Sequence, residues 1–213
     1  MPVKAKGKDS WAKRRLMRLT SLEKRAVNSP KHAERTVSIA LELLEHASLP
    51  ERPTCLELGC GQGALARLLV ERLDARVIAT DVDLDQVRLA ASRLADLGER
   101  VAVRVVDARE LPFADEAFDA VFSFAVMHHI AGGWRQVVAE VSRVLRPAGR
   151  FVFTDVYIPR WLARVFGRLF PRFDQLAFDP LEAALAASGL KITHQTWEHH
   201  GGMAFGKTVA TKR

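Results

Sequence analysis

Apolar positions along the chain alternate between short continuous runs and longer stretches in which they recur every three or four residues. The short runs predict buried strands, and the periodic stretches predict amphipathic helices. The predicted strands are Thr54–Leu58, Arg76–Thr80, Val101–Val106, Phe118–Phe122, Arg150–Val156, Leu190–Trp197 and Met203–Thr211. The predicted helices are Thr36–His46, Ala64–Leu73, Leu84–Leu97, Trp134–Leu145 and Leu181–Ala187.

This alternation of strands and helices predicts an α/β fold. Parallel strands need crossover connections, and helices of about a dozen residues supply such connections on both faces of a sheet. The last two strands are separated only by a tight turn that contains Gly201 and Gly202, so they pair antiparallel. We therefore expect a doubly wound, seven-stranded sheet, mostly parallel with the last strand antiparallel, in one domain over residues 31–213.

Net positive charge is concentrated at the start of the chain. The net charge of the 213 residues is +7, which by itself suggests a nucleic-acid partner. The first 35 residues contain 11 Lys/Arg and 3 Asp/Glu, a net charge of +8, and the rest of the chain has a net charge of −1. We therefore expect a basic leader over residues 1–30, partly disordered or helical, and a near-neutral domain that does not bind nucleic acid.

Other features of the composition narrow the class of protein. No run of about 18 apolar residues predicts a membrane span, and no basic stretch followed by an apolar one predicts a secretory signal, so a cytoplasmic protein is expected. The two cysteines, Cys55 and Cys60, have the spacing of neither a disulfide framework nor a metal site. We expect both to be reduced, partly buried thiols, and we expect no bound metal.

The strongest local signal is the glycine-rich segment Glu57–Ala64, with the sequence ELGCGQGA between a predicted strand and a predicted helix. Glycines let the backbone turn sharply and approach a ligand closely, while the helix presents free N–H groups. Gly59, Gly61 and Ala64 also satisfy a relaxed dinucleotide fingerprint, and Asp81 lies where a ribose-binding carboxylate belongs. These features are equally compatible with a nicotinamide cofactor and with other cofactors that contain adenosine.

Carboxylates at the ends of successive strands separate these cofactor classes. Glu57 lies two residues before Gly59, where a carboxylate repels a pyrophosphate and suits a cationic ammonium group. Asp107, which the small Ala108 follows, ends the third strand and can accept a hydrogen bond from an adenine amino group. Together with Asp81, these carboxylates indicate a ligand that has an ammonium group, a ribose diol and an adenine but no phosphate. That ligand is S-adenosylmethionine.

With these features the chain resembles the class I S-adenosylmethionine-dependent methyltransferases, and most closely the small-molecule (type 11) group that includes the quinone-biosynthesis enzymes. The resemblance extends from about Thr54 to Val156, and it implies a Rossmann-like sheet of strand order 3-2-1-4-5-7-6. Ala148 departs from the pattern, since such enzymes often have a second glycine there. The matching segments are ELGCGQG (57–63), VIATDV (77–82), VDA (106–108), LPF (111–113), FDAVFS (118–123), MHHI (127–130) and VLRPAGRFVF (144–153).

The resemblance also implies which residues contact each part of the cofactor. The implied contacts are Glu57, Gly59, Cys60, Gly61 and Gly63 at the methionine part, Asp81 at the ribose hydroxyls, Val82, Asp107 and Ala108 at the adenine, and Ser123, Phe124 and Ala125 beside the methyl-bearing sulfonium.

Two histidines just beyond the fourth strand are the candidate catalytic residues. A sulfonium is already a strong methyl donor, so a base is needed only where the acceptor must lose a proton. An unperturbed histidine has a pKa of about 6.5, which suits His128 or His129 for proton acceptance at neutral pH. The alternative is that one packs against the next helix and the other only shapes the pocket.

The segment Pro159–Phe173 has the pattern of a basic amphipathic helix. Apolar residues occupy one side, and Arg160, Arg164, Arg168 and Arg172 line a neighbouring stripe. Such a helix either packs its apolar face on the domain or acts as a lid for a lipophilic acceptor that contacts an anionic membrane surface. The basic leader would add to that membrane attraction.

The leading functional prediction is methyl transfer from S-adenosylmethionine to a small molecule, with S-adenosylhomocysteine as product. Quinone precursors, lipids and secondary metabolites are the candidate acceptors. RNA methylation that uses the basic leader and a non-catalytic cofactor-binding scaffold are the alternatives. Against RNA methylation, Ser123–Val126 stands where enzymes acting on flipped bases carry an Asn/Asp-Pro-Pro-Tyr/Phe loop. The methylated atom and the oligomeric state stay open.

Overall fold

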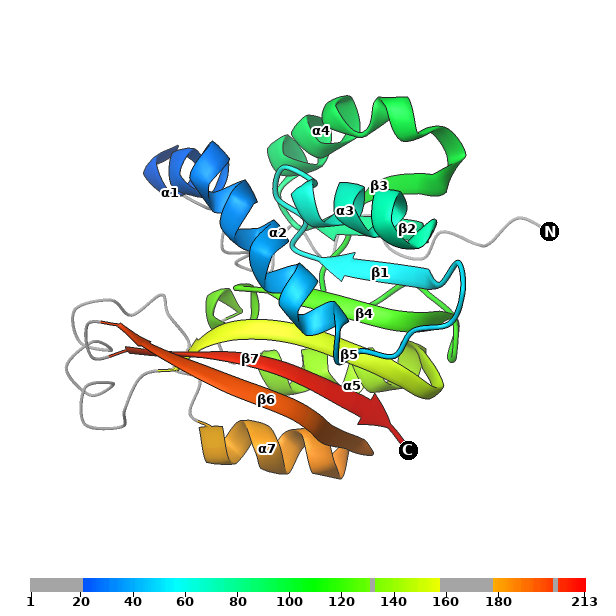
Figure 1. Ribbon diagram of the computed structural model, residues 1–213, viewed down its shortest axis with the longest axis vertical. Helices are drawn as coiled ribbons and strands as arrows, with labels where there is room; N and C mark the ends of the chain where they lie inside the picture. Colours follow the sequence, from blue (N-terminus) through cyan, green and yellow to red (C-terminus); the bar gives the residue numbers. More distant parts are fainter. Residues whose placement is uncertain (1–20, 131–132, 158–177, 201–202) are drawn as a thin grey trace.

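A twisted mixed sheet forms the centre of the molecule (Figure 1). The computed structural model describes residues 21–130, 133–157, 178–200 and 203–213. Within these ranges the sheet has seven strands in the order β3-β2-β1-β4-β5-β7-β6. The strands are β1 (Thr54–Leu58), β2 (Arg76–Asp81), β3 (Val101–Val105), β4 (Phe118–Phe124), β5 (Leu145–Tyr157), β6 (Leu190–His200) and β7 (Met203–Lys212). Only β7 runs antiparallel to its neighbours, so the expected topology is confirmed.

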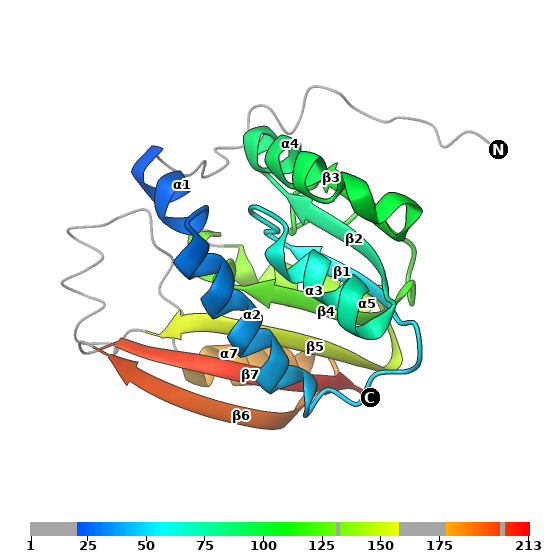
Figure 2. The same ribbon diagram turned by 45° about the horizontal axis from the view of Figure 1, so that its top comes forward.

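Helices cover both faces of the sheet (Figures 1 and 2). One face carries α2, α3 and α4, and the other carries α5 and α7. The α-helices are α1 (Ser21–Val27), α2 (Pro30–Leu44), α3 (Ala64–Leu73), α4 (Leu84–Arg93), α5 (Trp134–Val144) and α7 (Phe178–Ala187). The 3₁₀-helices are η1 (Ala95–Arg100) and η2 (Met127–His129).

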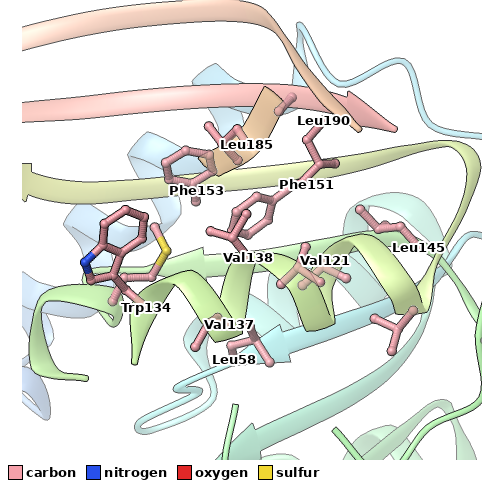
Figure 3. Packing of buried hydrophobic residues seen from close by; sticks show 14 of the residues in the cluster. Leu58, Val121, Trp134, Val137, Val138, Leu145, Phe151, Phe153, Leu185 and Leu190 are labelled. Carbon is pink, nitrogen blue, oxygen red and sulfur yellow. The ribbon is translucent and has the colours of Figure 1, made fainter. Parts of the chain in front are cut away.

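Two apolar layers, one on each face of the sheet, hold these elements together. Adjacent residues of the central strand β4 divide between them, because successive side chains of a strand point to opposite faces. Val121 packs in the layer under α5 and α7, whereas Phe122 packs in the layer under α2 and α3. Figure 3 shows the first layer, in which Val138 of α5 and Leu185 of α7 approach Phe153 of β5. Burial on both faces explains why the strands are apolar throughout.

Two predicted helix boundaries are wrong. The helix predicted over Leu84–Leu97 ends at Arg93 and gives way to η1, in which Gly98 has a positive φ of 59°. The guanidinium of Arg67 donates to the carbonyl oxygen of Arg93, which supplies that carbonyl with a partner outside the helix. The helix predicted from Leu181 begins earlier, at Phe178. The helix with the apolar pattern Thr36–His46 begins at Pro30, where the capping residues and the proline predict a start, and the Oγ of Ser29 accepts a hydrogen bond from the His32 N–H at 3.2 Å.

Parts of two other predictions lie outside the described residues. Of the expected basic leader, the structure describes residues from Ser21 onward, and these begin with α1. The amphipathic segment Pro159–Phe173 lies wholly outside. Among the described helices, none is long and apolar enough to cross a membrane.

Ala148 occupies a turn near the start of β5 with a φ of 61°, a conformation that favours glycine. Replacing Ala148 with Gly is expected to stabilise the protein by about 0.5–1 kcal/mol, because glycine adopts this φ without steric cost. Urea unfolding measures the change. Ala186→Gly, in the exposed part of the regular helix α7, is the matched control and is expected to destabilise by about 1 kcal/mol. A midpoint for Ala148→Gly at or below that of the unchanged protein would contradict this account of the turn.

Candidate active site

A cavity of about 390 Å³ lies at the carboxyl ends of the parallel strands, between the sheet and the start of α2. Ligands of doubly wound folds bind at such strand ends, where the strand order reverses, and here the reversal falls between β1 and β4. Most of the residues predicted from the sequence line this cavity. They are Glu57, Gly59, Cys60, Gly61, Asp81, Val82, Asp107, Ala108, Phe124, Ala125, His128 and His129. Gly63 and Ser123 lie behind the cavity wall.

The glycine-rich loop follows β1 and leads into α3. Gly59 has a φ of 67°, and a Cβ there would collide with the side chain of Val126. Gly61 has a φ of 51°, and a Cβ there would meet no atom within 4 Å, so the loop leaves open space beside the cavity. Glycine is therefore required at position 59 for packing, and at position 61 it leaves room for a ligand. Cys60 between them, like Cys55, is a buried free thiol, as expected.

Glu57 is a buried carboxylate on the cavity wall. Its side chain is enclosed at the end of β1, and the residue is only 4% exposed. Its Oε2 atom has no hydrogen-bond partner among the described residues. Burial, and secondly the neighbouring charge of Asp81, raise the pKa of Glu57 to about 8, while a backbone hydrogen bond from Ala66 opposes the shift. Such a group is suited to a cationic partner that enters the cavity.

Asp81 lies at the end of β2, and its carboxylate accepts hydrogen bonds from two loops, the glycine loop and the β2–α4 turn. Its Oδ2 accepts a hydrogen bond from the N–H of Gly61 at 3.1 Å, and its Oδ1 accepts one from the N–H of Asp83 at 2.9 Å. Burial raises the pKa of Asp81, and these backbone hydrogen bonds oppose that shift. The carboxylate therefore links the glycine loop to the β2–α4 turn and still has acceptor positions facing the cavity.

Asp107, which follows β3, is held by a neighbouring arginine. Both of its carboxylate oxygens accept hydrogen bonds from the guanidinium of Arg109, at 2.7 Å from Nη2 and 3.0 Å from Nε. Both residues line the cavity. The ion pair fixes the orientation of the carboxylate at the expected adenine edge, and Arg109 is a wall residue that the sequence did not single out.

A buried amide on α4 is a second wall residue missed by the sequence reasoning. Gln86 is 1% exposed and lines the cavity, and its Nε2 donor has no hydrogen-bond partner among the described residues. Because an unsatisfied buried donor costs free energy, its presence on a cavity wall points to a ligand acceptor. A lone Gln one turn into a helix carries no sequence signal that distinguishes it from an exposed residue.

The two candidate histidines lie in η2, directly after β4. His128 Nδ1 is 2.6 Å from the Oδ1 of Asp155 on β5, and that carboxylate is almost fully buried. The Oδ2 of Asp155 also accepts a hydrogen bond from the N–H of Met127 at 2.9 Å. The ring centroid of His129 is 4.0 Å from that of His128. The structure therefore gives His128 a buried carboxylate partner that fixes its ring and tautomer.

The opposite wall of the cavity comes from the N-terminal helices, and a helical cap over the active site was one of the roles that the sequence left open for the leader. Val27, His32 and Thr36 line it. Gln62 of the glycine loop anchors this wall, since its Nε2 donates to the carbonyl oxygens of Val27 and Ser29 at 3.1 and 3.3 Å. These contacts join segments more than 30 residues apart, so no local pattern in the sequence reveals them.

The donor and acceptor set fits S-adenosylmethionine. The unpartnered Oε2 of Glu57 suits an ammonium group, Asp81 suits a ribose diol, and the unpartnered Nε2 of Gln86 suits an oxygen acceptor. The open space beside Gly61 leaves room for the ligand backbone. The wall contains four carboxylates, those of Glu57, Asp81, Asp83 and Asp107, and this negative charge argues against a pyrophosphate, as the sequence predicted.

Known proteins show the same domain. Residues 56–153 match the family model described as a methyltransferase domain. The chain is 36% identical over 102 residues to the 27-O-demethylrifamycin SV methyltransferase of Amycolatopsis mediterranei, covering 47% of this chain and 37% of the relative. It is 32% identical over 156 residues to a ubiquinone biosynthesis O-methyltransferase of Rhizobium etli, covering 66% of this chain and 61% of the relative. The chain thus spans less than two thirds of the length of either relative.

A solved structure confirms the fold. The geranyl diphosphate C-methyltransferase from Streptomyces coelicolor A3(2), in complex with Mg²⁺, geranyl diphosphate and S-adenosyl-L-homocysteine, superposes with a TM-score of 0.72 at 16% identity and covers 88% of this chain and 89% of that chain. The matched family model, the named relatives and the fold agree with the cavity's donor and acceptor set. Residues 56–153 are therefore a methyltransferase domain, in a chain with a methyltransferase fold and a cavity that suits S-adenosylmethionine.

Proposed function

We propose that this chain transfers a methyl group from S-adenosylmethionine to a hydroxyl group of a small-molecule acceptor. The observation that carries the proposal is that one cavity contains both the strand-end carboxylates and a histidine oriented by a buried carboxylate. Relatives named as O-methyltransferases of small molecules support the acceptor class. A base is useful for a hydroxyl, which must lose its proton, and is not needed for a thioether or a tertiary amine.

The cofactor-binding roles follow from the donors and acceptors on the cavity wall. Glu57 pairs with the amino group of the methionine part, Asp81 accepts from the ribose hydroxyls, and Gln86 donates to a ribose oxygen. The glycine loop contacts the methionine part of the cofactor through Gly59, Cys60, Gly61 and Gly63. The adenine lies against Val82, Asp107 and Ala108. Ser123 and Phe124 lie toward the sulfonium. Ser123 and Gly63, behind the wall, act by supporting the backbone that lines it.

When bound, the cofactor supplies an electrophilic methyl group on its sulfonium sulfur. The residues of the chain align the acceptor oxygen with that methyl and exclude water, which supplies most of the rate acceleration. Asp155 accepts a hydrogen bond from Nδ1 of His128, so Nε2 is the ring nitrogen that takes the proton from the acceptor hydroxyl. Asp155 is a positioning residue, because it acts through His128.

Gln86→Met removes the unpartnered amide with little change in side-chain volume. We expect it to leave the free energy of unfolding of the cofactor-free protein unchanged or to raise it by about 1 kcal/mol, because no buried donor remains unsatisfied. We expect affinity for S-adenosylhomocysteine to fall by about tenfold, which corresponds to one lost hydrogen bond. Urea unfolding and calorimetry measure the two effects. Lower stability with unchanged affinity would show that Gln86 has only a structural role.

We also propose that the basic leader and the segment Pro159–Phe173 bring the enzyme to anionic lipid surfaces. The support is their composition: the first 35 residues have a net charge of +8, and the segment places arginines beside aromatic residues. Co-sedimentation with phosphatidylserine vesicles is expected at low ionic strength and is expected to weaken with salt, whereas phosphatidylcholine vesicles serve as the neutral control. Equal recovery of the protein in the supernatant with both vesicle types at low salt would refute this proposal.

Methyl-labelled cofactor tests the acceptor class directly. The protein is incubated with labelled S-adenosylmethionine, a panel of phenols, catechols and hydroxylated polyketides, and total RNA. We expect label in the organic-extractable products and not in RNA, and we expect the rate of labelling to be at least about 100-fold lower with His128→Gln. Label in RNA alone would support the alternative of RNA methylation, and tight cofactor binding without any transfer would support the non-catalytic scaffold.

A further inference from the structure

Glu57 is an enclosed charged group of the cavity wall, only 4% exposed, with one side-chain oxygen that has no hydrogen-bond partner among the described residues. It is paired on both sides in the sheet, with Ala79 of β2 on one flank and Phe122 of β4 on the other. Its backbone carbonyl oxygen accepts a hydrogen bond from Thr80 Oγ1 at 2.7 Å, but its side-chain Oε2 has no hydrogen-bond partner among the described residues. An ionised carboxylate in such a place loses hydration without gaining a counterion.

The charged and titratable groups around Glu57 do not supply that counterion. Asp81 approaches it from β2, and the thiol of Cys60 approaches it from the glycine loop. From the start of α3 it receives a backbone hydrogen bond from Ala66.

The other ionisable groups of the cavity are committed elsewhere or lie on other walls. Arg109 is bound to Asp107, and Asp83 forms an ion pair with Lys24 at 2.7 Å. The histidines of η2 lie at the end of β4, where His128 contacts Asp155, and His32 lies on α2. The immediate surroundings of Glu57 are therefore apolar or acidic, and both conditions favour its neutral form.

We propose that Glu57 carries a proton in the cofactor-free protein and releases it to solvent when the amino group of the cofactor binds. This inference rests on the proposed function, since it takes the cavity as the cofactor site. In the balanced step, a neutral carboxylic acid and a free ammonium ion become a carboxylate–ammonium pair, and one proton leaves for the buffer. The cofactor thus brings the counterion that the folded protein lacks.

The raised pKa of Glu57 determines the pH range in which the proton is released. The pKa of Glu57 is raised to about 8, chiefly by burial and then by Asp81. An α-amino group at a chain terminus has a pKa of about 7.7–8.0, and the carboxylate beside the amino group of S-adenosylhomocysteine raises its pKa further, so at pH 7 the ligand already carries its proton. Binding near pH 7 therefore releases close to one proton, and affinity falls about tenfold for each pH unit below about 7. Near pH 9 the release becomes small, because Glu57 is then already ionised before the ligand binds.

Calorimetry in buffers of different ionisation enthalpy measures this proton directly, with S-adenosylhomocysteine as the probe. At pH 7 we expect the binding enthalpy in phosphate and in Tris to differ by the heat of about one proton taken up by the buffer. At pH 9 we expect the difference to be much smaller, because Glu57 is already ionised in the free protein. Glu57→Gln is expected to bind more weakly and to lose the release at pH 7, whereas His128→Gln, the control for the other titratable group, is expected to keep it.

Carbon-13 NMR of the Glu57 carboxyl group gives a second readout in the unchanged protein, independent of whether Glu57→Gln folds. We expect a protonated carboxyl signal at pH 7 that shifts to the ionised position when S-adenosylhomocysteine is added. Binding at pH 7 without proton release, or an ionised Glu57 in the free protein, would overturn the inference and leave the proposed function intact. Absence of binding at every pH would overturn both.

Discussion

Asp81→Ala is expected to weaken binding of S-adenosylhomocysteine by about 100-fold or more. A hydrogen bond to a charged acceptor contributes about 1.5–3 kcal/mol, and a ribose diol can make two of them with one carboxylate. Asp81 also holds the N–H groups of Gly61 and Asp83, so its loss loosens the glycine loop and the β2–α4 turn at once. Both effects reduce affinity. Isothermal calorimetry measures the dissociation constant.

Two further variants identify the cause of this loss. Asp81→Asn keeps one acceptor oxygen and is expected to bind with intermediate affinity. Asp85→Ala removes an exposed carboxylate near the same strand end and is expected to change the dissociation constant by less than about twofold. An Asp81→Ala protein that binds as tightly as the unchanged protein would refute the ribose role of this carboxylate.

His128→Gln and Asp155→Asn are expected to lower kcat by about 10²–10⁴ while leaving the dissociation constant of S-adenosylhomocysteine nearly unchanged. Removing a general base costs this much when the acceptor must lose a proton. In Asp155→Asn the buried charge that orients His128 Nδ1 is lost, so the imidazole adopts the wrong tautomer or orientation. The acceptor identified with labelled cofactor is the substrate for the assay.

The pH dependence tests whether both variants have lost the same general base. Raising the pH is expected to restore part of the rate in both variants, because a larger fraction of the acceptor hydroxyl is then ionised without a base. His129→Gln is the matched control and is expected to keep most of kcat, since it leaves intact the contact between His128 Nδ1 and Asp155 Oδ1. If His129→Gln loses as much rate as His128→Gln, the two histidines act together and the assignment to His128 is wrong.

The sequence predicted most of the fold because its signals are local. The glycine loop and the strand-end carboxylates Glu57, Asp81 and Asp107 each follow a short apolar run, and parallel strands bring such ends to one edge of the sheet. The predicted strand β1 and helix α3 have the observed bounds. The helix α4 was predicted too long because its apolar pattern continues past Arg93, where a tertiary contact with Arg67 accompanies the change to η1.

The missing parts of the site depend on contacts between distant segments. Asp155 meets His128 only because β5 lies beside β4, and the sequence around Asp155 resembles any buried strand. The wall formed by the N-terminal helices is held at the cavity by Gln62. Its side-chain amide donates hydrogen bonds to the carbonyl oxygens of Val27 and Ser29, which precede it by more than 30 residues. Gln86 becomes recognisable only when burial shows that its donor is unsatisfied. Single-sequence patterns carry none of this information.

The central claim is that this cavity binds S-adenosylmethionine and its product rather than another adenosine cofactor. Calorimetric titration of the protein with S-adenosylhomocysteine and, separately, with NADH tests it most directly. The account predicts saturable 1:1 binding of S-adenosylhomocysteine with a dissociation constant on the order of micromolar, and no measurable heat of binding with NADH. Saturable binding of NADH without binding of S-adenosylhomocysteine would contradict it.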